Sequence, residues 1–82
     1  MAYVYILKSI NYRKTYTGST PNLEKRLGEH NKGLCIYTKR YKPWKLVYHE
    51  KLESLHEARL REKYFKSAAG RRFIKKQNII RA

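Results

Sequence analysis

Three short segments of the chain carry the hydrophobic pattern of β-strands. Residues 2–7 (Ala-Tyr-Val-Tyr-Ile-Leu) are mostly β-branched or aromatic, as strand residues commonly are. After a polar turn, residues 15–17 (Thr-Tyr-Thr) predict a second strand that pairs with the first as a hairpin, and we expect Gly18 to end or bulge it. Residues 44–50 alternate from Trp44 onward between two faces, which predicts a third strand.

The segment between the second and third strands predicts a helix and a loop. Thr20 is the expected N-cap, and Pro21 follows at the first helical position, where its missing N–H is not needed. Gly33 fits the C-terminal cap. The face of this helix repeats at i, i+4 and i+7 with Leu23, Leu27 and His30. Residues 34–43 are interpreted as a basic loop.

The C-terminal part of the chain predicts two more helices. Residues 54–57 (Ser-Leu-His-Glu) form a capping box that opens a helix running to about Ala69, with Gly70 as its stop. Residues 71–80 predict a third, short helix around Phe73, Ile74 and Ile80. The order β-β-α-β-α-α indicates an α+β fold in which helices flank a small three-stranded antiparallel sheet. With 82 residues, we expect one domain spanning residues 1–82.

The charge of the chain points to a polyanionic partner. Twenty Lys and Arg residues stand against six acidic residues, all of them Glu, and the formal net charge is +14. Both halves of the chain are basic, which excludes a simple basic tail on a neutral domain. A charge this large destabilises a compact state through self-repulsion and is typical of nucleic-acid-binding proteins. We therefore expect nucleic acid as the partner, with DNA favoured over RNA.

Other features of the composition bear on compartment. Cys35 is the one cysteine, which excludes an internal disulfide and favours a reducing compartment such as the cytoplasm. No apolar run approaches the ~20 residues of a membrane span, and the first residues lack the features of a signal peptide. We expect a cytoplasmic protein that does not contact membranes, with a monomer favoured.

Glu62 conflicts with the hydrophobic pattern of its predicted helix. On a helical wheel it falls inside the stripe made by Leu55, Ala58, Phe65 and Ala69. A carboxylate on a core-facing stripe is unfavourable unless it is paired or binds a metal, and such exceptions tend to mark functional sites. Two interpretations stay open: Glu62 pairs with one of the many Lys or Arg residues, or it has a metal-binding or catalytic role.

Arg26, His30 and several tyrosines are further candidates for chemistry. Arg26 and His30 lie one helical turn apart, and an arginine can stabilise charge on a phosphoryl group. The alternatives are a solvated arginine and a hydrogen-bonded boundary histidine. Tyr5 and Tyr16 face each other if the hairpin is correct, although core packing also explains most tyrosines. A tyrosine acts as a base only when its pKa falls, which positive surroundings favour.

These residues together resemble the signature of the GIY-YIG nucleases. Tyr3-Val4-Tyr5, ten intervening residues and Tyr16-Thr17-Gly18 are similar to the two halves of the signature. Residues 19–31 resemble the first helix of the family, and residues 57–62 resemble the helix that carries its metal-binding Glu. The likeness spans residues 3 to about 66 and is greatest to the small single-domain bacterial branch. The first triplet lacks its Gly and middle Ile, Thr17 replaces an Ile, and Ser19 stands where some members have Lys.

The resemblance implies a metal-dependent endonuclease that hydrolyses phosphodiester bonds. Glu62 would hold Mg²⁺ or Mn²⁺, and Arg26 would stabilise the added charge on phosphorus. Tyr5 and Tyr16 would orient and deprotonate the attacking water, with Tyr5 favoured as the base. His30 would position or activate that tyrosine or hydrogen-bond the phosphate. The Asn that often follows the metal Glu in the family is not assigned, because the surroundings of Asn78 do not match.

Two basic segments are candidates for nucleic-acid contact. The loop over residues 37–45 interleaves cations with aromatic residues, which suits phosphate contact and base stacking, unless Trp44 and Tyr37 pack inward. The candidate contacts are Lys39, Arg40, Lys42, Lys45, Arg71, Arg72, Lys75 and Lys76. Such contacts do not read sequence, so we expect structure-dependent selectivity and a role in repair or nucleic-acid processing. The alternatives are a non-catalytic nucleic-acid-binding module and an adaptor of a larger repair complex.

Overall fold

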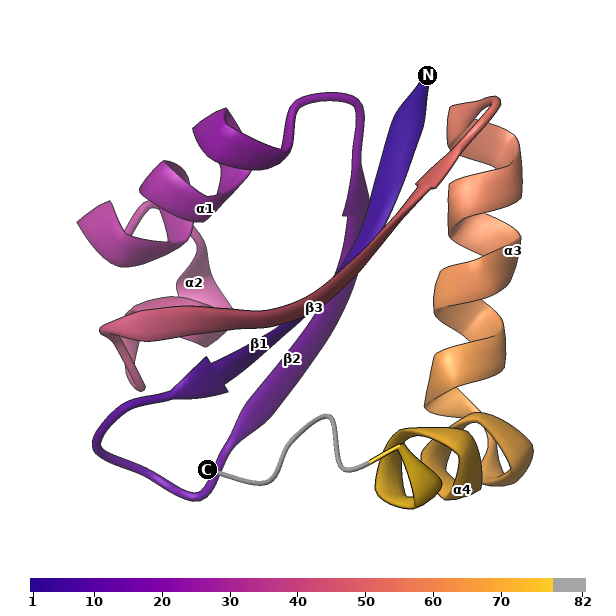
Figure 1. Cartoon of the computed structure of the whole chain (residues 1–82). Helices are drawn as coiled ribbons and strands as arrows, with labels where there is room; N and C mark the ends of the chain where they lie inside the picture. The colour runs from indigo at the N-terminus through magenta and orange to yellow at the C-terminus, as the bar shows by residue number, and fades with distance from the viewer. Residues whose placement is uncertain (78–82) are drawn as a thin grey trace.

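The protein is built on a three-stranded antiparallel sheet, seen in a computed structural model that describes residues 1–77 (Figure 1). The strands are β1 (Ala2–Ser9), β2 (Thr15–Thr20) and β3 (Trp44–Leu52), in the spatial order β2-β1-β3. β1 and β2 form the predicted hairpin, with Tyr5 opposite Gly18, so Gly18 neither ends nor bulges the strand. A register shift where β1 pairs with β3 lies between Ile6 and Leu7.

The central strand β1 is buried on both of its faces. Val4 and Ile6 pack on one face against Phe65 and Ile74, and Tyr5 and Leu7 pack on the other against Trp44. Because side chains alternate along a strand, one strand supplies two separate hydrophobic clusters. A strand covered on both sides has no solvent face, which explains its nearly continuous apolar sequence.

Two helices lie on the Tyr5 face of the sheet. They are α1 (Leu23–Lys32) and the short α2 (Ile36–Lys39), which forms inside the segment predicted as a loop. The predicted N-cap is wrong: Thr20 is buried at the end of β2, and the side chain of Asn22 caps α1 by accepting from the N–H of Lys25 at 3.1 Å. The C-terminal cap is confirmed, because Gly33 adopts a left-handed conformation with φ of 80°.

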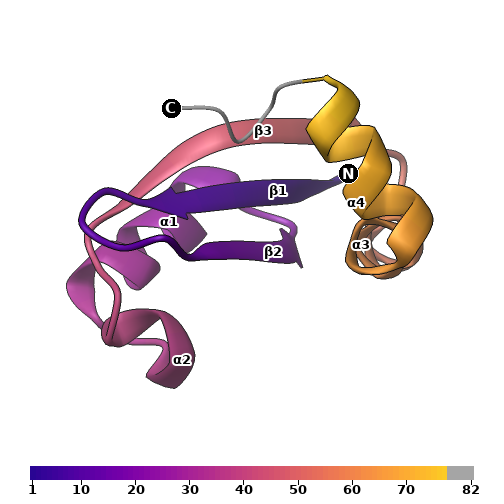
Figure 2. The same cartoon turned by 90° about the horizontal axis from the view of Figure 1, so that it is seen from below.

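Two helices cover the Val4 face (Figure 2). α3 (Leu55–Lys66) begins at the predicted cap, where Ser54 accepts from the N–H of Glu57, but it ends at Ser67, which also caps α4 (Ala68–Lys76). Gly70 is therefore not a helix stop. It lies inside α4, where a Cβ atom would overlap the Tyr64 carbonyl oxygen and the Phe65 Cα, so it permits α4 to cross closely over α3.

The predicted α+β fold and the order β-β-α-β-α-α are confirmed, with α2 as an addition. Of the residues predicted to centre the last helix, Ile74 is buried and Phe73 packs against the same cluster, whereas Ile80 lies outside the described residues. Within residues 1–77, no helix combines the length and the apolar character needed to cross a membrane.

Candidate active site

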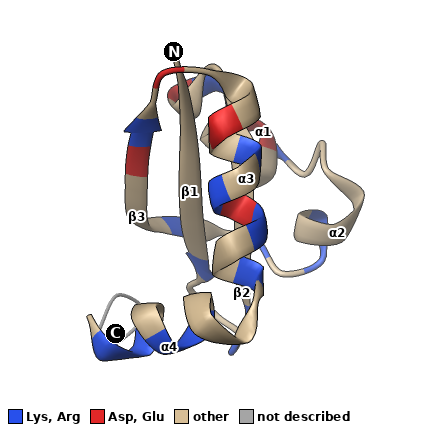
Figure 3. Ribbon diagram, turned by 90° about the vertical axis from the view of Figure 1, so that its right-hand side faces the viewer, with Lys and Arg blue, Asp and Glu red and all other residues tan. Residues whose placement is uncertain are grey.

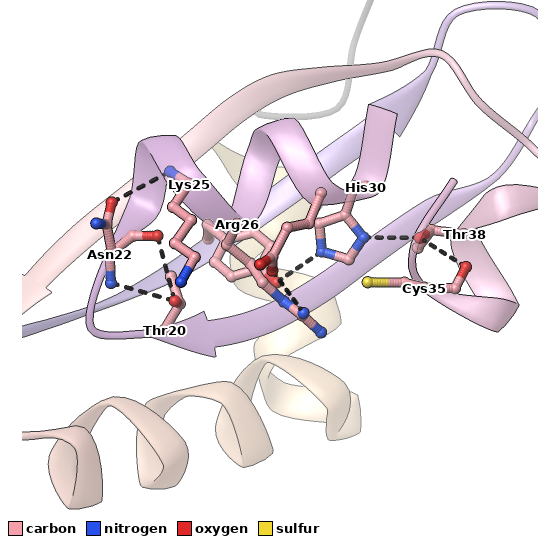
Figure 4. A network of polar contacts seen from close by, with 9 residues as sticks. Thr20, Asn22, Lys25, Arg26, His30, Cys35 and Thr38 are labelled. Carbon is pink, nitrogen blue, oxygen red and sulfur yellow. Dashed lines mark hydrogen bonds and ion pairs between the residues drawn. The ribbon is translucent and has the colours of Figure 1, made fainter. Parts of the chain in front are cut away.

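A buried chain of hydrogen bonds runs from the central strand into α1 and α2 (Figure 4). The Tyr5 hydroxyl lies 2.9 Å from Nε2 of His30, and Nδ1 of His30 lies 2.7 Å from the Thr38 hydroxyl. Thr38 in turn donates to the Cys35 carbonyl at 3.5 Å. With its proton directed at that carbonyl, the Thr38 oxygen accepts from Nδ1–H of His30. Nε2 is then the acceptor, and the Tyr5 hydroxyl donates to it.

Burial sets the protonation of this chain. His30 is fully buried. Desolvation, followed by the nearby Arg26 charge, lowers the pKa of His30 to about 4, so the imidazole is neutral at physiological pH. Desolvation also raises the pKa of Tyr5 to about 12, although Arg26 acts in the opposite direction. At Tyr5, burial therefore outweighs the effect of the nearby positive charge on the pKa.

Tyr16 and Arg26 complete a cluster around His30. The Tyr16 ring lies 5.0 Å from the His30 ring and 6.3 Å from the Tyr5 ring. Arg26 is partly exposed and pairs with Glu29 at 3.0 Å, and this hydrogen bond is the main reason that the pKa of Arg26 is raised. The structure thus brings four of the expected residues together beside β2: Tyr5, Tyr16, Arg26 and His30.

Gly18 leaves room for the two phenols. A Cβ atom at this position would lie 2.5 Å from the Tyr5 hydroxyl oxygen and 2.9 Å from the Tyr16 ring. The glycine of the second triplet therefore permits a close approach of Tyr5 to the backbone of β2. Any larger side chain would displace the hydroxyl that bonds to His30.

Glu62 lies on α3, on the opposite face of the sheet from His30 and close to the edge strand β2. The Glu62 side chain is 22% exposed. Ser19 of β2 donates to one carboxylate oxygen at 2.7 Å, and Lys66 pairs with the other at 2.6 Å. The Lys66 ammonium is also 6.0 Å from the centre of the Tyr16 ring. Ser19 therefore ties the carboxylate to β2, and Lys66 is the residue that approaches the cluster, at Tyr16. The ion pair expected in one interpretation of Glu62 is present.

An open groove of about 390 Å³ lies over Glu62 and is otherwise lined by cations, namely Arg59, Lys63 and Lys66. A single carboxylate facing such a groove has the oxygen ligands that Mg²⁺ and Mn²⁺ prefer and leaves space for the waters that these ions retain. Within residues 1–77, no group of three or more His, Cys or acidic side chains comes together that could form an all-protein metal cage. A metal held by Glu62 would therefore have one side-chain ligand, complete its shell with water or phosphate oxygens, and replace Lys66 at the carboxylate.

The predicted cationic contacts divide between two regions. Lys39 belongs to α2 and Arg40 and Lys42 follow it, near the Tyr16 side of the molecule, and Lys45 is exposed on β3. The other four, Arg71, Arg72, Lys75 and Lys76, are exposed on α4. This helix lies away from α2 in all three views of the fold (Figures 1, 2 and 3). The two aromatic residues of the loop also differ, since Trp44 is buried and donates to the Thr38 carbonyl at 2.8 Å while Tyr37 is exposed.

Sequence reasoning missed three contacts of this site. Thr38 was hidden in a segment interpreted as loop, and its partner His30 is 8 residues away. Ser19 was noted as a departure from a family Lys, with no partner assigned. The spacing of Lys66 four residues after Glu62 is a signal that could have identified the ion pair, because residues at i and i+4 are neighbours on a helix.

The sequence of the chain is similar to those of known proteins. The family model described as the GIY-YIG catalytic domain matches residues 1–78. A UPF0213 protein of Clostridium perfringens is 51% identical over 67 residues, which are 80% of this chain and 71% of the relative. A UPF0213 protein of Syntrophus aciditrophicus is 45% identical over 80 residues, 93% of this chain and 91% of the relative. One from Staphylococcus haemolyticus is 40% identical over 74 residues, 89% of each chain. No solved structure matches the chain.

Proposed function

The chain belongs to the GIY-YIG nuclease family, as its resemblance predicted, and from that premise we propose that it is a metal-dependent endonuclease that hydrolyses phosphodiester bonds in DNA. One observation carries the proposal. Tyr5, Tyr16, Arg26 and His30 form one cluster, and Lys66, which pairs with Glu62, lies 6.0 Å from the Tyr16 ring of that cluster.

Glu62 is the residue that would hold the metal. When bound, Mg²⁺ or Mn²⁺ supplies positive charge to the phosphate and to the leaving oxygen. The hydrogen bond from Ser19 fixes the orientation of the carboxylate, as outer partners of metal-binding carboxylates commonly do. Arg26 lies on the partly exposed surface of α1, from which its guanidinium can stabilise the charge that develops on phosphorus.

Tyr5 and His30 would handle the proton of the attacking water. With its pKa raised to about 12, Tyr5 keeps its proton at neutral pH, and that proton points toward Nε2 of His30. The Tyr5 oxygen can therefore accept a hydrogen bond from water. As the water oxygen bonds to phosphorus and the leaving oxygen departs, a water proton passes to Tyr5 and the Tyr5 proton passes to His30. Tyr16, which is less buried, would hold the water in line.

A second candidate function is non-catalytic binding of nucleic acid. The observation that favours it is the Lys66 ammonium, which pairs with one carboxylate oxygen of Glu62 and would compete with a metal for that carboxylate. If that pair persists with substrate bound, Glu62 has a structural role and the basic surface alone acts. Under this alternative, Lys66→Ala does not create or increase cleavage, and the protein still binds DNA with an affinity that falls as salt rises.

A nicking assay on supercoiled plasmid and on branched duplexes tests the catalytic proposal. We expect cleavage with Mg²⁺ or Mn²⁺ and none with chelator. Glu62→Ala and Arg26→Ala should each lower the rate at least about a thousandfold, equivalent to about 4 kcal/mol of transition-state stabilisation.

The matched control is Glu53→Gln, which changes an exposed carboxylate at the end of β3 outside the site. It should leave the rate unchanged. Cleavage that survives in both site variants would mean that a contaminating nuclease is responsible. Absence of cleavage in the parent protein, with tight DNA binding retained, would favour the binding module.

A further inference from the structure

Four tyrosine rings form a row that begins at the candidate active site and extends away from it. The ring centres of Tyr16 and Tyr37 are 6.0 Å apart, those of Tyr37 and Tyr41 are 5.9 Å apart, and those of Tyr41 and Tyr12 are 5.4 Å apart. Tyr12 belongs to the β1–β2 turn and Tyr16 to β2. Tyr37 belongs to α2, and Tyr41 follows that helix. The fold therefore assembles the row from segments that are distant in the sequence, and the catalytic scheme uses only Tyr16.

Two members of the row are open to solvent. Tyr37 is 54% exposed and Tyr12 is 52% exposed, and neither packs against a hydrophobic cluster, whereas Tyr41 between them is half-buried and packs against the Tyr5 cluster. Large exposed aromatic side chains that gather in one place indicate a binding surface more often than chance exposure. The chemistry of the ligand must therefore suit flat aromatic faces.

Cations flank the same rings. The Lys14 ammonium lies 5.3 Å from the centre of the Tyr41 ring, and the Arg40 guanidinium lies 5.9 Å from it. At the inner end of the row, Lys66 lies over Tyr16. Proteins bind single-stranded nucleic acid with two components: aromatic rings on which bases stack, and cations that contact the phosphates.

We propose that the row formed by Tyr12, Tyr41, Tyr37 and Tyr16 binds an unpaired DNA strand and leads it to the active site. A base inside a duplex is already stacked on its neighbours, so its face is closed to an exposed tyrosine. An unpaired nucleotide has a free base face that can stack on a tyrosine ring and a charged phosphate that can contact a cation. The inference rests on the proposed function for its end point, since the row ends at Tyr16, and it assigns single-stranded or frayed regions as the substrate class.

Binding measured in chelator tests the row without requiring cleavage. The probes are a labelled oligothymidylate of about 20 nucleotides, long enough to cover a typical single-strand site, and a blunt duplex of the same length. Fluorescence anisotropy should show that Tyr37→Ala and Tyr12→Ala each weaken oligothymidylate binding about tenfold, with more loss in the double variant. Binding of the duplex should change less than about twofold, because phosphate contacts remain.

Two control variants make the result specific. Tyr37→Phe keeps the ring and should keep the affinity for oligothymidylate. Leu60→Ala removes an exposed hydrophobic side chain of similar exposure, 56%, on the opposite face of the sheet and should have no effect. Circular dichroism of each variant shows that the fold is retained.

Two results would overturn the inference: unchanged oligothymidylate binding in the double variant, or an equal loss for the single strand and the duplex. These outcomes are separable from failure of the nuclease proposal. If the parent protein never cleaves but its affinity for single strands depends on Tyr37 and Tyr12, strand binding by the tyrosine row is supported and the nuclease proposal fails. If the site variants abolish cleavage while the row variants bind oligothymidylate normally, the nuclease proposal is supported and the tyrosine row is not a binding site.

Discussion

The two faces of β1 contain the same kinds of strand residues but serve different ends. On the α3 and α4 face, Val4 and Ile6 meet Phe65 and Ile74 in an apolar cluster. On the α1 and α2 face, the buried space next to Tyr5 is filled by His30 and Thr38, which are joined by hydrogen bonds. Under the proposed function, this small protein therefore separates a stabilising face from a chemical face, and one alternating strand supplies both.

The separation is incomplete in one respect. Glu62 belongs to α3, the helix of the stabilising face, yet the proposed reaction requires it together with groups on the other face. The structure resolves this by placing Glu62 beside β2, the edge strand, where Ser19 contacts it. An edge strand leaves both faces accessible at one border, so groups from opposite faces of the sheet can meet a single phosphate there.

Gly70→Ala should give the largest effect, on the stabilising face alone. A Cβ atom would overlap backbone atoms of Tyr64 and Phe65, which cannot move as a side chain can. We expect a loss of about 3 kcal/mol or more in the free energy of unfolding, equivalent to a fall of about 12 °C or more in Tm for a domain of this size. Thermal unfolding followed by circular dichroism measures it. A Tm within a few degrees of the parent value would show that the crossing of α4 over α3 is looser than described.

Acid pH should give the second-largest effect, a loss of stability on the face of β1 that contacts His30. The pKa of His30 is about 4 in the folded protein and 6.5 in the unfolded chain, so the unfolded chain binds the proton more readily. The contribution of neutral His30 to the free energy of unfolding is therefore complete above pH 6.5. It is lost as the pH falls toward 4, and the free energy of unfolding then decreases by about 3 kcal/mol.

Urea unfolding at neutral pH and just above pH 4 measures this loss, and an NMR titration of the His30 ring measures the pKa directly. A ring that titrates near 6.5 would mean that His30 is solvated rather than buried beside Tyr5.

Tyr5→Phe should separate activity from stability on the chemical face. The change removes the donor to Nε2 of His30 and leaves a buried acceptor unpaired, which costs about 1–3 kcal/mol. The rate of cleavage should fall about a hundredfold or more, because the water loses its acceptor. Urea unfolding and the nicking assay are compared on the same preparation. An unchanged rate would transfer the role of base to Tyr16.

Ser19→Ala should have the smallest effect and tests the link between the faces. Loss of the 2.7 Å hydrogen bond to Glu62 should change the free energy of unfolding by only about 1 kcal/mol. It should weaken Mn²⁺ binding about tenfold, since Ser19 orients the carboxylate. Calorimetric titration with Mn²⁺ measures this, and Ser19→Thr, which keeps the hydroxyl, is the control. Equal Mn²⁺ affinity in parent and Ser19→Ala would show that Ser19 only packs against α3.

Local signals in the sequence predicted elements well where the cause was also local. The β-branched and aromatic run of β1, the cap at Ser54 and the left-handed Gly33 depend on neighbouring residues, and all three were predicted. Gly70 was misread because its reason is a contact between two helices. Asn22 rather than Thr20 caps α1 because the sheet pairs Thr20 with Tyr3 and so extends β2 through that residue.

For the candidate site, the sequence by itself determined which residue types are available, and their spacing placed Tyr5, Tyr16, Arg26, His30 and Glu62 on particular elements. Only the tertiary structure decided that His30 is buried and neutral, that Tyr5 has a raised pKa, and that Glu62 lies between Ser19 and Lys66. The physical reason is that solvation and hydrogen-bond partners depend on distances between segments far apart in the chain. A pattern of residue types records the local preferences of the backbone but not those distances.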